Sequence, residues 1–151
     1  MARTLTKTAM ILVASAAIAA DEPRLDSALR AAGLSADEMA RATDAALPKR
    51  GGSAFAIAVH RKQRSLVLVL LRQASGEYRA VDVSAVEDGN FGKLGFPRSR
   101  YDRFETQPVE WLARADGWFQ VVIRTRAWQS GQRYTASEPL IIRPDGTPVW
   151  R

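Results

Sequence analysis

Cysteine is absent from this chain of 151 residues, and histidine occurs once, as His60. The first absence excludes disulfides, thiolate metal sites and the lipid anchor of a bacterial lipoprotein. With one histidine, a zinc site would need mainly carboxylate ligands, which is uncommon. A serine hydrolase would have to use His60, yet no G-x-S-x-G motif is present. We therefore interpret His60 as a solvated turn residue and expect neither a cofactor, a metal nor a catalytic residue.

Long hydrophobic runs are also lacking. After Arg3 and Lys7, residues 8–20 are uncharged, and their apolar part is too short to cross a bilayer core of about 30 Å. This run ends in small residues that fit an A-x-A cleavage site, which predicts a Sec-type signal peptide at 1–19 and one domain at 20–151. The alternative is an amphipathic or buried first helix. The Ala- and Arg-rich signal is typical of bacteria, so we expect a protein of the periplasm or the exterior, with no stable membrane insertion after cleavage.

The positive charge is moderate. The chain has 22 Lys and Arg against 16 Asp and Glu, a net charge of +6, and removal of Arg3 and Lys7 would leave 20 against 16, or +4. Such a balance favours anionic surfaces only weakly. Together with the predicted export, it makes nucleic acid an unexpected partner.

The fold class expected is α+β, with a short helical hairpin packed on six or seven antiparallel strands that form one sheet, a sandwich or a partial barrel. The hairpin is predicted at 22–47, where Ser35 and Glu38 have the spacing of a capping box. A first β-meander is predicted at 54–86. Residues 66–71 are apolar on both faces, which is typical of a central strand covered on both sides.

A second β-meander is predicted at 108–150. A three-residue loop at 115–117 puts Trp111, Phe119 and Val121 on one face and gives Gly117 the left-handed position that such loops need. A further turn at 130–131 would pair Trp128 with Arg133. Arg124, Arg126 and Arg133 then share the other face with Trp128.

A long loop is predicted at 87–107, because residues 89–105 show no apolar periodicity and contain three glycines. Its four aromatic residues make an ordered loop the better expectation. We expect Phe91 and Phe96 to fasten it to the core. Because aromatic and arginine residues dominate binding hot spots, this loop and the arginine-bearing sheet face supply the candidate binding residues. These are Arg98, Arg100, Tyr101, Arg103, Arg124, Arg126, Trp128 and Arg133.

Three functions remain open. The first is a non-enzymatic envelope protein, inhibitor- or immunity-like, that binds a protein partner through this loop and the sheet face. The alternative is a binder of a small ligand or anionic glycan, in a pocket between sheet and helices lined by Trp111 and Tyr134. The third is a carboxylate hydrolase, which needs two acids converging in a cleft. Its candidates are Asp82, Asp88, Asp102 and Glu105. A solvated sheet face without a binding role is the alternative interpretation of the arginines.

Overall fold

The computed structural model describes residues 23–44, 46, 48 and 53–150. It shows an α+β fold with two antiparallel sheets. The predicted signal peptide at 1–19 lies outside the described residues. Among the helices of the described part, none is long and apolar enough to cross a membrane.

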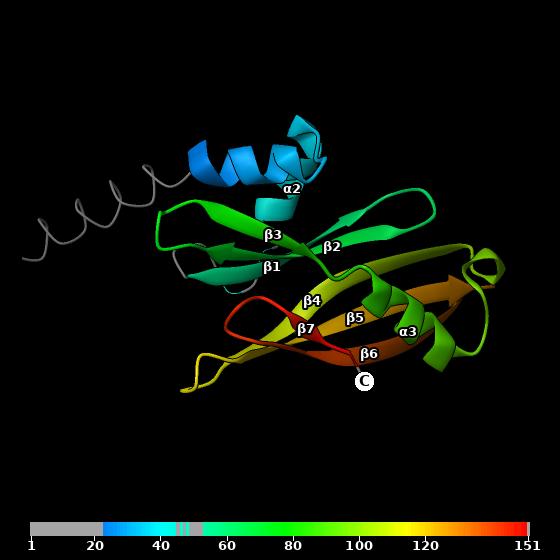
Figure 1. Ribbon diagram of the computed structural model, residues 1–151. Helices are drawn as coiled ribbons and strands as arrows, with labels where there is room; N and C mark the ends of the chain where they lie inside the picture. Colours follow the sequence, from blue (N-terminus) through cyan, green and yellow to red (C-terminus); the bar gives the residue numbers. More distant parts are fainter. Residues whose placement is uncertain (1–22, 45, 47, 49–52, 151) are drawn as a thin grey trace, which may run out of the picture.

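The protein is built in layers (Figure 1). Residues 23–31 and α2 (Ala36–Asp44) form the first helical layer. Beneath it lies a three-stranded sheet of β1 (Ala54–His60), β2 (Ser65–Arg72) and β3 (Tyr78–Asp82), in that order. Leu29 and Met39 of the helices pack on the near face of this sheet, against residues such as Ile57. Each helix is short, so its stability depends on this packing.

The second sheet has four strands in the order β4 (Arg103–Ala113), β5 (Phe119–Gln129), β6 (Gln132–Ile142) and β7 (Pro148–Val149). The far face of the first sheet packs on its inner face, where Val67 and Val69 meet Val121 and Ile123. Strand β2 is therefore central and buried on both faces, as its continuous apolar sequence predicted.

Residues 85–107 differ from the predicted long loop. They contain α3 (Ala85–Leu94), the short 3-10 helix η1 (Arg98–Arg100) and the start of β4, so the second meander begins at 103 rather than 108. Helix α3 buries Val86, Glu87, Asn90 and Phe91. Two of these four are polar. The buried positions therefore have helical spacing, but the apolar residues of the sequence do not show it.

Helix α3 covers the part of the inner face of the second sheet that the first sheet leaves uncovered. The Asn90 amide donates to the carbonyl of Ile123 at 3.1 Å, and Phe91 packs in a small aromatic cluster with Phe104 and Ala127. The chain leaves the helix at Gly95, whose φ of 86° is the left-handed conformation that ends many helices.

The predicted hairpin register is confirmed near its turn. Trp111 pairs with Val121 and Ala113 with Phe119, which leaves the three-residue loop 115–117. Further along, a bulge between Pro108 and Glu110 shifts the register by one residue. Because of this bulge, Pro108 and not Val109 pairs with Ile123.

Candidate functional site

The outer face of the second sheet brings Arg103, Trp128 and Arg133 into one row. Arg103 pairs with Trp128 on one side, and Arg133 pairs with it on the other. The guanidinium of Arg103 lies 3.9 Å from the centre of the Trp128 ring, a close cation–π contact. Three predicted site residues thus share a row, and the Trp128–Arg133 pairing is as the sequence predicted.

Arg124 and Arg126 follow on the same face, in the middle of β5. Arg126 lies opposite Glu105 and makes an ion pair of 3.6 Å with it. Arg124 lies between Gln107 and Ser137. Its Nε is buried and has no hydrogen-bond partner among the described residues. Arg124 is thus a guanidinium on an open face, with no ion pair to any carboxylate of the described residues.

The other half of this face is mainly apolar. Leu112, Val122 and Ile141 lie there, and Leu112 is 56% exposed. Beyond them is Trp118, with Arg114 and Arg143 each 5.8 Å from its ring centre. An Arg–Trp contact therefore lies at each end of the outer face of the second sheet.

Positive charge dominates this outer face. Six arginines stand against three carboxylates, which gives a net charge of +3; the arginines are Arg103, Arg114, Arg124, Arg126, Arg133 and Arg143, and the acids are Glu105, Glu110 and Asp116. No described helix or strand packs over it, since the first sheet and α3 both lie on the inner face. The face is open to a partner.

Arg98, predicted as a contact residue, also makes ion pairs within the fold. Its guanidinium binds the buried carboxylate of Glu87 through Nε and Nη2, at 3.2 and 3.1 Å, and Asp88 through Nη2 at 2.6 Å. Its side chain is only 25% exposed. Burial alone lowers the pKa of Arg98, but the hydrogen bonds to Asp88 and Glu87 outweigh it and raise the pKa above its usual value. Arg98 therefore holds the fold together.

Tyr101, also predicted as a contact residue, is mostly buried. It is 8% exposed and packs between Phe91 and Tyr134, so it belongs to the core. Its hydroxyl has no partner among the described residues, and burial, with Tyr134 nearby, raises the pKa of this phenol.

Phe91 is buried as predicted, whereas Phe96 is 47% exposed and does not fasten the segment. Arg100 is exposed in η1, outside the strands of the second sheet.

A buried polar network, not predicted from the sequence, lies between the two sheets. Glu87 of α3 is fully buried and accepts hydrogen bonds from the Ser65 amide and the Thr106 hydroxyl. The Thr106 hydroxyl lies 2.9 Å from that of Thr125, which accepts from the Asn90 amide. Only the helical spacing of Glu87 and Asn90 with Val86 and Phe91 could have indicated this network.

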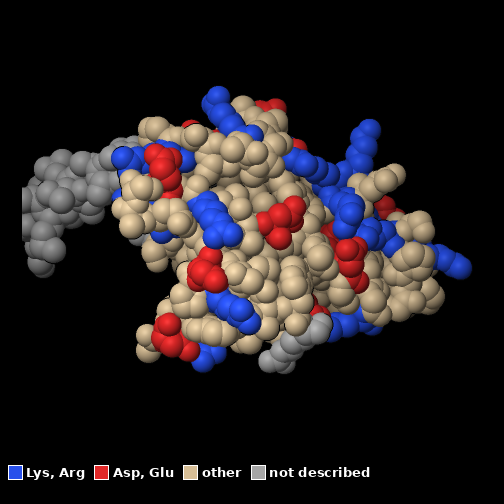
Figure 2. All heavy atoms as spheres, viewed as in Figure 1, with Lys and Arg blue, Asp and Glu red and all other residues tan. Residues whose placement is uncertain are grey.

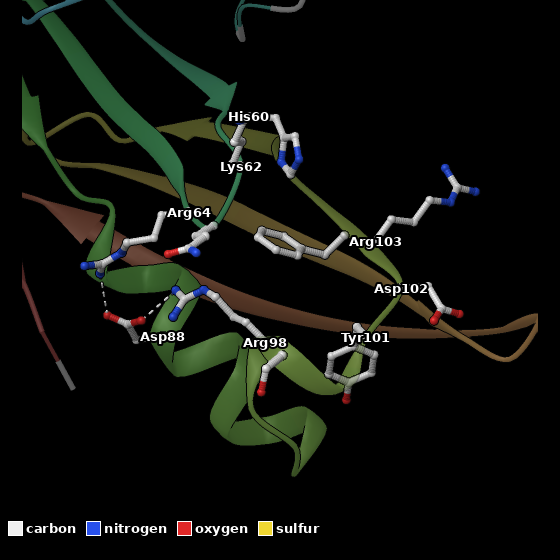
Figure 3. A pocket seen from close by; sticks show the side chains of 11 residues that line it. His60, Lys62, Arg64, Asp88, Arg98, Tyr101, Asp102 and Arg103 are labelled. Atoms are coloured by element: carbon white, nitrogen blue, oxygen red, sulfur yellow. Dashed lines mark hydrogen bonds and ion pairs between the residues drawn. The ribbon is translucent and has the colours of Figure 1, made fainter.

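A cleft of about 760 Å³ lies at one end of the molecule, between the β1–β2 turn and the segment from α3 to β4. His60 and Lys62 form one wall, and Arg98 and Tyr101 lie across from them (Figure 3). Blue side chains gather over this end of the molecule, with red ones between them (Figure 2). Three predicted site residues, Arg98, Tyr101 and Arg103, line this cleft.

The four candidate carboxylates of the hydrolase hypothesis lie on different elements. Asp82 accepts from the Ser84 amide, Asp102 from the Ser130 amide, and Glu105 pairs with Arg126. Asp88 is held by two arginines, Arg64 and Arg98. Asp88 and Asp102 both line the cleft, but they lie at opposite ends of it (Figure 3). No two of the four share a hydrogen-bonding partner in the described structure.

Trp111 and Tyr134, the two residues expected to line a pocket between sheet and helices, do not lie together. Trp111 stacks on Phe119 at 4.9 Å, whereas Tyr134 contacts Tyr101 in a different cluster. A separate hollow of about 340 Å³ lies between residues 28–32 and the first sheet. Its lining is mostly alanine and leucine.

Within the described residues, no three His, Asp or Glu side chains gather closely enough to hold a metal ion. No family model matches the chain, and comparisons with curated proteins and with solved structures found no match either.

Proposed function

We propose that this protein is an exported bacterial envelope protein that binds an acidic protein partner, in the manner of an inhibitor or immunity protein, through the outer face of its second sheet. One observation carries the proposal. This face presents arginine and tryptophan together on a sheet that no described element covers. These residue types dominate binding hot spots in protein interfaces.

Charge favours an acidic partner over a second copy of the chain. The face carries six arginines against three carboxylates, so two such faces would repel each other in an isologous dimer. Arg124 and Arg126 lie at its centre, and Arg124 has no ion pair among the described residues, so its guanidinium is available to pair with a carboxylate-bearing surface. The apolar half around Val122 would exclude water from the contact.

Export supports an envelope partner. The uncharged run at 8–20, with basic residues before it and small residues at its end, favours cleavage after residue 19 and release into the periplasm or the exterior. The absence of cysteine from the sequence means that the protein does not need an oxidising compartment in order to fold.

The experiment compares the mature protein with Arg124→Glu/Arg126→Glu as baits in envelope extract. The control, Arg30→Glu/Arg41→Glu, makes the same charge change on exposed residues of the helical layer. We expect a partner rich in Asp and Glu that wild type and control retain, and that the outer-face variant binds at least about tenfold more weakly. Binding should also weaken with salt, because exposed charges are screened beyond about 10 Å at 0.1 M. Equal retention by all three baits would contradict the proposal.

A further inference from the structure

We propose that the cleft beside the β1–β2 turn is a second, separate binding site that takes a sugar acid, a pyranose bearing a carboxylate. Its volume of about 760 Å³ lies within the range of roughly 300 to 1,000 Å³ typical of ligand pockets. Four parts of the chain line it: the β1–β2 turn, α3, η1 and the start of β4.

Hydrogen-bond donors for a carboxylate come from both walls. Lys62 lines the cleft and has no ion pair or hydrogen-bond partner within the described part of the chain. Arg98 uses Nε and Nη2 for Glu87 and Asp88, which leaves Nη1 for a ligand. Arg64 uses only Nη2, toward Asp88. The acids therefore hold two guanidinium groups in place without using all their donors, so the donors are positioned before a ligand arrives.

The cleft also contains hydrogen-bond acceptors, which an anion without hydroxyl groups would not use. The Oδ2 of Asp102 accepts the Ser130 amide, and Oδ1 has no partner in the described structure. Gln63 and Ser99 line the cleft as further acceptors and donors. Hydroxyl groups can donate to these acceptors while the carboxylate binds the cations. A hydroxylated anion fits this mixed lining better than a simple inorganic anion does.

Two rings supply an apolar surface for the sugar. His60 and Phe104 pack edge to face with ring centres 5.1 Å apart, and both line the cleft. The C–H groups of a pyranose can lie against such rings while its hydroxyls reach the polar wall. Phe104 also packs on Phe91, edge to face at 5.1 Å.

This site is independent of the proposed protein-binding face. Arg103 touches both regions, but its guanidinium lies over Trp128 on the outer face and points away from His60 and Arg98 (Figure 3). Arg124 and Arg126 do not line the cleft. Variants of the two regions can therefore be tested separately.

The test is calorimetric titration of the mature protein with D-glucuronate, glucose 6-phosphate and glucose. We expect saturable binding of glucuronate, weaker binding of glucose 6-phosphate and none of glucose. Lys62→Ala should weaken glucuronate binding about tenfold, the usual effect of losing one charge-assisted hydrogen bond. Lys62 is exposed in a turn, so this variant should fold normally. The control Arg124→Glu/Arg126→Glu should bind glucuronate as wild type does.

Absence of saturable glucuronate binding, or equal binding of glucose, would overturn the proposal. Stronger binding of glucose 6-phosphate would overturn the carboxylate assignment. A loss that is the same in Lys62→Ala and in the outer-face variant would place the ligand elsewhere. Because the outer-face variant tests protein binding and Lys62→Ala tests the cleft, failure of one proposal leaves the other measurable.

Discussion

Arginine side chains have two roles in this protein, and their partners separate these roles. Arg98 binds the buried carboxylate of Glu87, whereas Arg124 lies on the open outer face and has no acid partner in the described part of the chain. The sequence placed both in one group of candidate contacts, because residue type alone does not show where a carboxylate will be buried. Glu87 follows Val86 in a segment without apolar periodicity, so the hydrophobic pattern does not indicate its burial.

Removal of Arg98 is predicted to destabilise the fold strongly. Arg98→Ala would leave Glu87 buried without its cation, a loss of about 3 kcal/mol in the free energy of unfolding. Arg100→Ala, two residues away and exposed, should change it by less than about 0.5 kcal/mol. Urea unfolding measures the free energy of unfolding of both variants.

A double variant tests whether the loss belongs to the ion pair. In Glu87→Gln/Arg98→Ala the buried charge is gone, so the combined loss should be smaller than the sum of the two single losses. Additive losses, or equal stability of Arg98→Ala and Arg100→Ala, would contradict the role given to this pair.

Among the elements, those with strong local signals were predicted and α3 was not. The capping box is confirmed: the Ser35 hydroxyl accepts from the Glu38 amide, and Glu38 accepts from the Ser35 amide, each at 3.2 Å. Strand β2 and the loop at 115–117 followed from apolar pattern and turn chemistry. In contrast, α3 contains Gly89 and Gly92, each of which costs a helix about 1 kcal/mol relative to alanine. Tertiary contacts stabilise this helix, so local propensity fails there.

The start of α2 is predicted to be sensitive to acid. The hydrogen bond from Arg61 lowers the pKa of Glu38 below its ordinary value of 4.5, against partial burial, which raises it. A lowered pKa means that the ionised form stabilises the fold above pH 4.5, and this stabilisation is lost as the pH falls through the folded-state pKa. Glu38→Gln should therefore flatten the loss of stability between neutral and acidic pH.

Thermal unfolding across this pH range measures the effect. Asp37→Asn, which removes one negative charge from the same helical turn, is the matched control. Ser35→Ala should cost about 1 kcal/mol at neutral pH, because the Glu38 amide loses its cap. An unchanged pH dependence in Glu38→Gln would contradict the role of this carboxylate.

The whole molecule is asymmetric in how its layers are covered. Helices cover the first sheet, the first sheet and α3 cover the inner face of the second, and the outer face of the second sheet remains open in the described structure (Figure 1). The sequence predicted that Arg124, Arg126, Trp128 and Arg133 share that face, since strand alternation and turn register fix this, but it placed Arg103 and Glu105 in the long loop. It could not predict the cleft, because its walls come from segments 60–64, 88 and 98–104, which only tertiary folding brings together.

The most direct test of the central claim is site-specific photo-crosslinking in envelope extract. A photoreactive residue replaces Thr135, exposed on the outer face, or Asp26, exposed on the helical layer. We predict an adduct with an acidic protein from position 135 only, and its loss when Arg124→Glu/Arg126→Glu is added. An adduct from position 26 alone, the same adduct from both positions, or none from position 135 would contradict the claim that this face binds the partner.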